Sequence, residues 1–125
     1  MDMVVLQSIS TNDGASLAAT DTVSVEAYDK ITVAVPQGAA DLEVELQPDT
    51  ASAAKALFIT SNVYQNGLSY KVHDVGTTKI NLDHPQLYLG VGQVGVLEDV
   101  PSKLFFTNGG AAVTVTIIVG RDATP

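Results

Sequence analysis

The chain contains no cysteine and no tryptophan, and only six of its 125 residues are basic. Without cysteine, disulfides, thiolate zinc sites and cysteine nucleophiles are all excluded. Nucleic-acid affinity depends on clustered Lys and Arg that displace counterions from phosphates, so this shortage argues against a nucleic-acid partner. No apolar run approaches the roughly 18 residues of a membrane span, and no basic n-region opens the chain, so we expect neither a membrane partner nor a secretory leader.

Residues 1–125 are predicted to form a single domain. Apolar residues make up 46% of the chain and charged residues 16%, a balance that supports a buried core and is too poor in charge for a disordered segment. No internal repeat, low-complexity tract or long linker divides the sequence. A chain of this length buries roughly two-thirds of its unfolded surface, so it needs no cross-links to stay folded.

Negative charge is concentrated in the first part of the chain. The net charge is −8, and Lys30 is the only base before position 50, where nine acids occur. From residue 50 onward, five acids balance five bases. We interpret the acidic first part as a surface that keeps the protein soluble.

Apolar and polar residues alternate with a period of two along most of the chain, which is typical of strands with one buried face. In the segment 42–46, the leucines and Val44 are expected to face the core and the two glutamates the solvent. The strongest signal is the run Ala112–Val119. Expected strands cover residues 4–6, 22–27, 31–35, 42–46, 57–60, 68–72, 79–82, 86–89, 104–107 and 112–119.

Turn-forming residues separate these strands at the spacing of about 8–12 residues expected of sandwiches and barrels. Asn12-Asp13-Gly14 and Asn108-Gly109-Gly110 are examples, and Asn66-Gly67 predicts a tight hairpin. Only residues 50–56 have a helical pattern, one or two turns long. Since no helical layer could cover a single open sheet, we predict an all-β, two-sheet β-sandwich of about 8–10 strands with jelly-roll or Greek-key topology.

The segment Gly90-Val91-Gly92-Gln93-Val94-Gly95 matches the G-x-G-x-x-G pattern of dinucleotide-binding folds. In those folds the glycines open a long helix, and an acid about 20 residues further on binds the ribose. Here Pro101 would stop such a helix, and no Asp or Glu lies between residues 100 and 121. We therefore interpret the segment as a glycine-rich loop or a bulged strand and expect no cofactor.

Two His/Asp pairs, His73-Asp74 and Asp83-His84, flank the expected strand 79–82. An imidazole beside a carboxylate suits zinc binding or acid–base catalysis, but neither pair has a third ligand nearby in the sequence. Turns explain both pairs better, and no serine lies in a nucleophile elbow. We predict a protein that is not an enzyme and holds no metal, with calcium between the acidic loops of neighbouring subunits as an open alternative.

Apolar residues near the end of the chain form the predicted interface. Because neighbours on a strand face opposite ways, one of Phe105 and Phe106 is expected in the core and the other outside, while Phe58 is expected in the core. Three successive apolar residues from 117 to 119 indicate burial on both sides or an apolar face that meets another subunit. The tail 121–125 is expected to be mobile or to lie on a neighbour. The candidate interface residues are Phe105, Phe106, Ile117, Ile118, Val119 and Arg121.

Three stretches together resemble small structural proteins of tailed bacteriophage virions. They are residues 56–61 with 68–72, the Leu82-Asp83-His84-Pro85-Gln86-Leu87-Tyr88-Leu89-Gly90 segment, and residues 104–108 running through to Val119-Gly120-Arg121-Asp122. Proteins of this kind are encoded beside the major capsid protein and are proposed as capsid cement or decoration proteins. The resemblance implies a β-sandwich or jelly roll that is made in the host cytoplasm and located on the capsid surface of the virion. It also implies binding to the major capsid protein, bridging of neighbouring capsomers, and a homo-oligomer, with a trimer favoured and a dimer as the alternative.

A second interpretation is a receptor- or carbohydrate-binding β-sandwich module of a phage tail or an adhesin. Sugar-binding faces often expose several aromatic rings, tryptophan in particular. The chain has four Tyr, three Phe and no Trp. This scarcity favours the capsid interpretation.

Overall fold

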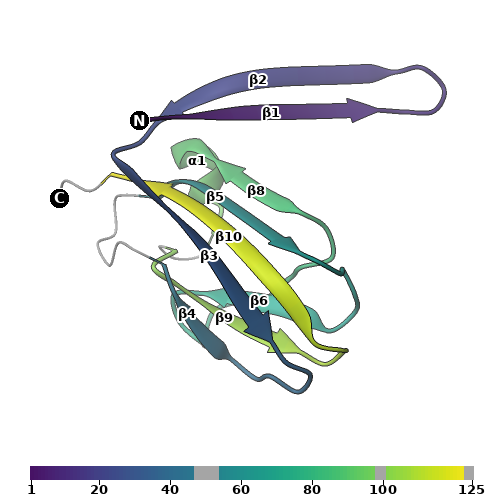
Figure 1. Cartoon of the computed structure of the whole chain (residues 1–125), viewed down its shortest axis with the longest axis vertical. Helices are drawn as coiled ribbons and strands as arrows, with labels where there is room; N and C mark the ends of the chain where they lie inside the picture. The colour runs from purple at the N-terminus through teal and green to yellow at the C-terminus, as the bar shows by residue number, and fades with distance from the viewer. Residues whose placement is uncertain (47–53, 98–100, 123–125) are drawn as a thin grey trace.

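Ten strands and one short helix follow one another in the part of the chain that the structure, a computed structural model, describes: residues 1–46, 54–97 and 101–122 (Figure 1). Nearly all of the regular structure is β, as the alternating pattern predicted. The elements are β1 (Asp2–Ser10), β2 (Ser16–Ser24), β3 (Ala27–Val35), β4 (Leu42–Glu45), β5 (Ala54–Ser61), β6 (Leu68–Val72), β7 (Ile80–Asn81), β8 (Gln86–Leu89), α1 (Gly90–Val94), β9 (Lys103–Asn108) and β10 (Val113–Arg121).

Two four-stranded antiparallel sheets pack face to face. The first, here called the β3 sheet, has the order β3-β10-β5-β8, and the second, here called the β4 sheet, has the order β4-β9-β6-β7. The longest ladder within these two sheets joins β3 and β10 over nine residue pairs, from Val35↔Val113 to Ala27↔Arg121. The predicted two-sheet sandwich is confirmed. Strands β1 and β2 pair with each other as a separate two-stranded hairpin.

The core lies between the two sheets and takes every second residue of their strands. In β10 the residues at 113, 115, 117 and 119 are buried, while those between them face outward or are half-buried. The Tyr70 and Phe106 rings of the β4 sheet lie 5.9 Å apart at an angle of 46°. Each such side chain, once fully buried, contributes about 1.5–3 kcal/mol. Other fully buried members are Val35, Leu46, Leu57, Ile59, Leu68, Leu82, Leu104, Val115 and Ile117.

Two buried polar side chains tie the sheets and loops together. The Tyr70 hydroxyl donates to Gln86 Oε1 at 2.5 Å and lies 2.8 Å from the Tyr88 hydroxyl, which links β6 of one sheet to β8 of the other. Burial, aided by the Tyr88 hydrogen bond, raises the pKa of Tyr70 far above its ordinary value. Asn108 Nδ2 donates to the carbonyls of Val35 and Ala111, at 3.2 and 2.9 Å. These bonds hold the ends of β3, β9 and β10 together.

Most expected strands are confirmed. Residues 68–72 and 86–89 are strands at the predicted bounds, and the runs at 31–35, 57–60, 104–107 and 112–119 lie within or almost entirely within β3, β5, β9 and β10. In β4, Val44 is buried and the glutamates are exposed, as predicted. Of the phenylalanine pair, Phe106 lies in the core and Phe105 faces outward, half-buried, which confirms the opposite orientation of neighbours on a strand.

Four local predictions are wrong or incomplete. Of the expected helix 50–56, residues 54–56 belong to strand β5 because they pair with β10 and β8, and residues 50–53 lie outside the described residues. Asn66-Gly67 does not form a tight hairpin, since β5 and β6 belong to different sheets. The segment 90–95 contains the helix α1 rather than a loop or bulged strand, because the Gln93 side chain accepts the N–H of Leu89 and supports one turn. The expected strand 22–27 spans the break between β2 and β3, and residues 16–21 of β2 were missed.

Candidate functional site

The hairpin of β1 and β2, here called the arm, stands apart from the sandwich. Its strands pair from Asp2↔Ser24 to Ser10↔Ser16. Figure 1 shows the arm lying across one end of the β3 sheet and extending well past β8. Among the described residues, β1 and β2 pair only with each other. Both long edges of the arm therefore carry rows of N–H and C=O groups without a strand partner.

The loop 11–15 closes the far end of the arm. Gly14 has a φ of 106°, a conformation that glycine adopts without steric cost, and its N–H donates to the Thr11 carbonyl at 3.2 Å. The Thr11 N–H donates to the Ala15 carbonyl at 2.8 Å. The Thr11 hydroxyl donates to the Asp13 carboxylate and holds the pKa of that carboxyl below its ordinary value. The predicted turn at Asn12-Asp13-Gly14 is confirmed.

The arm exposes apolar side chains on both of its faces. Leu6 is 77% exposed, and Val4 lies two residues away on the same face. Ile9 and Leu17 lie opposite each other on the other face, 72% and 76% exposed. No residue of β1 or β2 is buried. Large apolar side chains gathered on an exposed element mark an interaction surface.

Main-chain hydrogen bonds attach the base of the arm to the sandwich. The amino group of Met1 donates to the Val25 carbonyl at 3.0 Å, and the Val25 N–H donates back to Met1 at 2.8 Å. The next residue, Glu26, donates its N–H to the carbonyl of Arg121, the last residue of β10, at 2.9 Å. The side chain of Val25 is itself buried. The base of the arm is therefore fixed to the sandwich by main-chain hydrogen bonds.

A glycine in β10 makes room for the first residues of the arm. A Cβ at Gly120 would overlap the Met3 sulfur and would come within 3.1 Å of Val25 Cγ1. Any larger residue at this position would therefore push Met3 away. The close approach of the arm to the sheet depends on the missing side chain.

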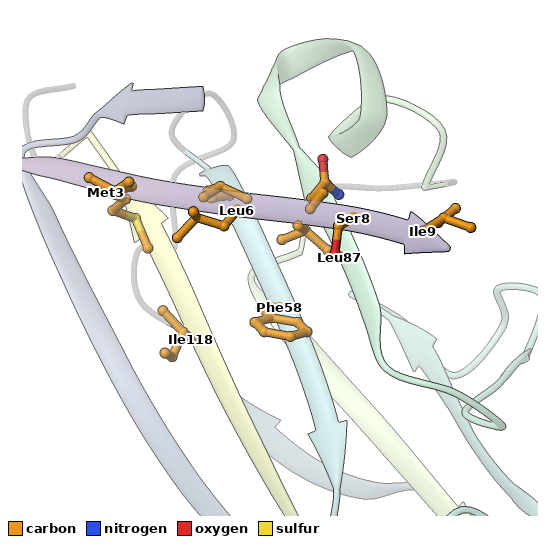
Figure 2. A pocket seen from close by; sticks show the side chains of 11 residues that line it. Met3, Leu6, Ser8, Ile9, Phe58, Leu87 and Ile118 are labelled. Carbon is orange, nitrogen blue, oxygen red and sulfur yellow. The ribbon is translucent and has the colours of Figure 1, made fainter. Parts of the chain in front are cut away.

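An apolar groove of about 600 Å³ separates the arm from the outer face of the β3 sheet. Figure 2 shows the floor of the groove, formed by Phe58 of β5, Leu87 of β8 and Ile118 of β10, with β1 passing above them. Strand β1 contributes the other side, from Met3 to Ile9. The groove offers hydrophobic contact rather than a set of convergent polar groups.

The floor of the groove is one row of cross-strand neighbours in the β3 sheet. In this row Lys30 lies opposite Ile118, Ile118 opposite Phe58, and Phe58 opposite Leu87. The adjacent row is uncharged and consists of Thr32, Thr116 and Thr60. The outer face of this sheet is thus apolar or hydroxyl-bearing, with one exposed ammonium at the end of the row.

Paired charges occupy the outer face of the β4 sheet instead. Lys103 lies 3.1 Å from Glu43 and 3.7 Å from Glu45, and Lys71 lies 3.3 Å from Asp41. The hydrogen bond and charge of Glu43, with a smaller effect of Glu45, raise the pKa of Lys103. This face resembles an ordinary solvated surface, unlike the outer face of the β3 sheet.

The structure does not gather the six predicted interface residues on one surface. Phe106, Ile117 and Val119 have no exposed area in the single chain and pack in its core. Phe105 and Ile118 are half-buried on the outer faces of different sheets. Arg121 donates from Nε to Asp29 Oδ2 at 3.2 Å, so it is held by its own chain. Contact of these residues with another protein stays a prediction.

Only the first two residues of the predicted tail, 121–125, belong to the described part of the chain. Asp122 pairs with Lys55 at 3.1 Å, so the first two residues of the tail are anchored by their own chain. Residues 123–125 lie outside the described residues.

Phe58 was expected in the core, and this prediction is wrong. Leu57 and Ile59 take the inward positions of β5, so Phe58 must face outward, where it is 38% exposed. The arm was not recognised from the sequence either. The available signal was the turn 12–14 between two nine-residue segments of β-compatible residues, without any charge except Asp2 and Asp21.

The two His/Asp pairs, His73-Asp74 and Asp83-His84, lie in turns or bends. Asp74 Oδ1 accepts the N–H of Gly76 at 3.0 Å, which confirms that Asp74 caps a turn. His73 Nδ1 lies 2.7 Å from Ser102 Oγ. The Asp83-His84 pair lies in the exposed bend between β7 and β8. Across the described ranges, no three His, Asp or Glu side chains gather closely enough to hold a metal ion.

Comparisons of the chain with protein-family models, with curated proteins and with solved structures gave no match. Within residues 1–46, 54–97 and 101–122, helical structure does not reach the length and apolar character that a membrane crossing requires.

Proposed function

We propose that this chain is a structural virion protein, a capsid cement or decoration protein that binds the major capsid protein on the outer shell and bridges neighbouring capsomers. The main support for this proposal is the exposed apolar surface of the arm. None of its side chains is fully buried in its own chain and most are exposed, so their apolar character contributes little to the stability of the monomer. An element of this kind is explained by contact with other proteins, as in a protein whose work is assembly.

The order of strand pairing supports a jelly-roll topology. Among the eight strands of the sandwich, the first pairs with the last, the second with the next to last, and so on inward: β3 with β10, β4 with β9, β5 with β8, and β6 with β7. Such nested pairing is what a long hairpin rolled into two sheets produces. Viral capsid and lectin domains both use this architecture. Fold analogy alone does not choose between them, and the apolar arm favours assembly.

The negative charge of the chain argues against nucleic acid as its partner. The net charge is −8, and the first part of the chain is the most acidic. Phosphate backbones repel such a surface, so the partner is a protein shell rather than the packaged genome. In this proposal the protein acts on the virion without catalysis, as a homo-oligomer with a trimer favoured.

Co-sedimentation with empty shells tests the proposal. The shells are assembled from the major capsid protein encoded beside the gene of this chain and mixed with the purified full chain. We expect the protein to pellet with the shells at a fixed number of copies per capsomer and to raise the temperature at which the shells rupture. Val96→Thr, an exposed position far from the arm in sequence, serves as a control and should bind equally.

Failure to pellet at any protein concentration up to about 100 μM would overturn the proposal, because a weaker interface could not occupy a capsid lattice. If the protein also bound defined oligosaccharides on a glycan array, the receptor- or carbohydrate-binding module would replace it.

A further inference from the structure

The far half of the arm exposes apolar side chains that a partner could cover. A two-stranded hairpin by itself is marginally stable in water. Here Ile9 and Leu17 pair beside the loop that closes the arm, and they are 72% and 76% exposed. Figure 1 shows this end of the arm extending past β8. Long apolar strands with open edges pair or pack with other chains unless charges or prolines block them. The strands of the arm contain no lysine, arginine or proline, and their only charged side chains are Asp2 and Asp21.

We infer that this partner is a second copy of the chain, and that the arm of one copy packs against the outer face of the β3 sheet of the next. The receiving surface is the row of Lys30, Ile118, Phe58 and Leu87. The inference extends the proposed function by naming the surface that joins the copies. It rests on the arm and this row alone, and it applies to the protein in solution without a capsid.

Hydrophobic matching is the first reason for choosing a second copy. The arm exposes Ile9 and Leu17 on one face and Leu6 on the other, and the same molecule offers Phe58, Leu87 and Ile118 along an open groove. Figure 2 shows β1 crossing, at a steep angle, the strands that carry Ile118, Phe58 and Leu87. A second ribbon laid into the groove would cover both the floor and the lower face of the resident arm. One chain thus carries both halves of an apolar interface.

Charge complementarity is the second reason. Residues 1–29 contain no Lys or Arg, and Asp2, Asp13 and Asp21 belong to the arm or its loop. The receiving row ends at Lys30, which is exposed and takes part in none of the ion pairs of the described residues. An acidic ribbon laid over the row would place a carboxylate near this ammonium. Opposite charges at the rim of an interface fix its orientation and speed its formation.

The available area is the third reason. A nine-residue strand is about 30 Å long, and two paired strands are about 10 Å wide, so one face of the arm covers about 300 Å². If each copy gives one arm and receives one, about 600 Å² is covered on every copy by these contacts alone. This is close to the ~800 Å² per partner of a standard stable interface. When the arm of each copy binds the β3 sheet of the next copy, the copies close into a ring if the rotation between them allows it. Two copies that exchange arms form the smallest closed assembly of this kind.

Light scattering of the purified full chain, with a matched pair of variants, tests the inference. The wild type should have a mass of two or three chains at micromolar concentration. Leu6→Thr/Ile9→Thr/Leu17→Thr keeps strand-forming side chains but removes most of the apolar surface of the arm, and it should raise the dissociation constant of the oligomer at least ~100-fold. Val96→Thr removes an equally exposed side chain elsewhere and should change the constant less than about twofold.

A monomeric wild type at about 100 μM would overturn the inference, as would a triple variant that remains as oligomeric as Val96→Thr. Thermal unfolding monitors whether the variants are folded. These outcomes are separate from capsid binding. A monomer that pellets with shells would keep the proposed capsid binding and overturn the arm-mediated oligomer, and an oligomer that does not pellet with shells would keep the oligomer and overturn capsid binding.

Cross-linking identifies the receiving surface, and the absence of native cysteine makes every engineered thiol unique. Copies carrying Leu17→Cys are mixed with copies carrying Phe58→Cys and treated with a short bismaleimide. Because each copy has one thiol, a bond between the two kinds of copy joins arm to face across chains. We expect a two-chain product that is at least tenfold more abundant than the product of Val96→Cys with Phe58→Cys. Equal yields, or no product from the first mixture, would show that the arm does not lie on this face.

Discussion

The arm and the sandwich are built from the same alternating pattern, yet they differ completely in what covers their apolar side chains. In β10 four alternate residues are buried, whereas in β1 and β2 none is. The difference lies in the neighbours. Strand β10 has a strand on each side and a second sheet against its inner face, while among the described strands β1 and β2 pair only with each other. Alternation therefore determines which side chains share a face, and the packing of elements determines whether that face is buried.

The largest expected contrast between the two regions is in core truncation. Phe106→Ala removes a fully buried ring that packs against Tyr70, so it should lower the free energy of unfolding by about 3–5 kcal/mol. Leu6→Ala in the arm should lower the stability of the monomer by less than about 0.5 kcal/mol, because Leu6 buries little. Urea denaturation of both variants measures this difference. Comparable losses would mean that the arm is part of the cooperative core.

A smaller loss is expected from the buried amide that joins the strand ends. Asn108→Ala leaves the Val35 carbonyl without this donor and the Gly110 N–H without its acceptor, while the Ala111 carbonyl keeps the Gln65 amide as a donor. The loss should cost about 2 kcal/mol. Asn66→Ala, at an exposed turn position, is the matched control and should change stability by less than about 0.5 kcal/mol. Both values come from the same denaturation experiment. If the two variants were equally stable, Asn108 would not be holding these loops together.

Alkaline pH should lower the free energy of unfolding because Tyr70 is buried in the sandwich. Tyr70→Phe should cost about 1 kcal/mol at neutral pH, because it removes the hydrogen bonds to Gln86 and Tyr88. The raised pKa of Tyr70 means that the folded protein keeps the phenol proton above pH 10 while the unfolded chain loses it. Stability from this group is therefore complete below about pH 10 and falls by about 1.4 kcal/mol per pH unit above it.

The measurement is the difference between wild type and Tyr70→Phe in unfolding free energy at pH 9 and at pH 11. The variant should lose less stability over this interval, since its phenol is gone. A parallel loss in the two proteins would show that Tyr70 ionises as freely when folded as when unfolded.

The smallest expected effect lies at the junction of the two regions. Gly120→Ala places a methyl group against the Met3 sulfur and close to Val25 Cγ1, so the base of the arm must shift. Global stability should change by less than about 1 kcal/mol, because Met3 is a flexible side chain. Hydrogen exchange of peptides from residues 2–24 should become faster, while exchange of β5 and β6 stays the same. Adding Met3→Ala should restore slow exchange; a double variant as fast as Gly120→Ala would rule out a steric cause.

Sequence reasoning succeeded where a residue's surroundings are set by its immediate neighbours. The inward side of Val44 and the opposite orientations of Phe105 and Phe106 follow from the pleat of a single strand. It failed where a distant segment decides. Residues 54–56 have helix-forming side chains but pair with β10 and β8, and Phe58 could be placed only once Leu57 and Ile59 were known to face inward. The candidate site was missed for the same reason. The arm is distinguished by the exposure of its apolar side chains, and this exposure depends on which segments pack together, which the sequence does not show.

By itself, then, the sequence determined an all-β chain of about ten strands in two sheets, because period-two alternation, turn residues and the lack of helical patterns are local properties. Only the tertiary structure decided the strand order, the separate place of β1 and β2, and the groove above Phe58, Leu87 and Ile118. These depend on pairings between residues far apart in the chain, such as Ile118 with Lys30 and Phe58. Such pairings are selected by the burial of the whole core and not by any one segment.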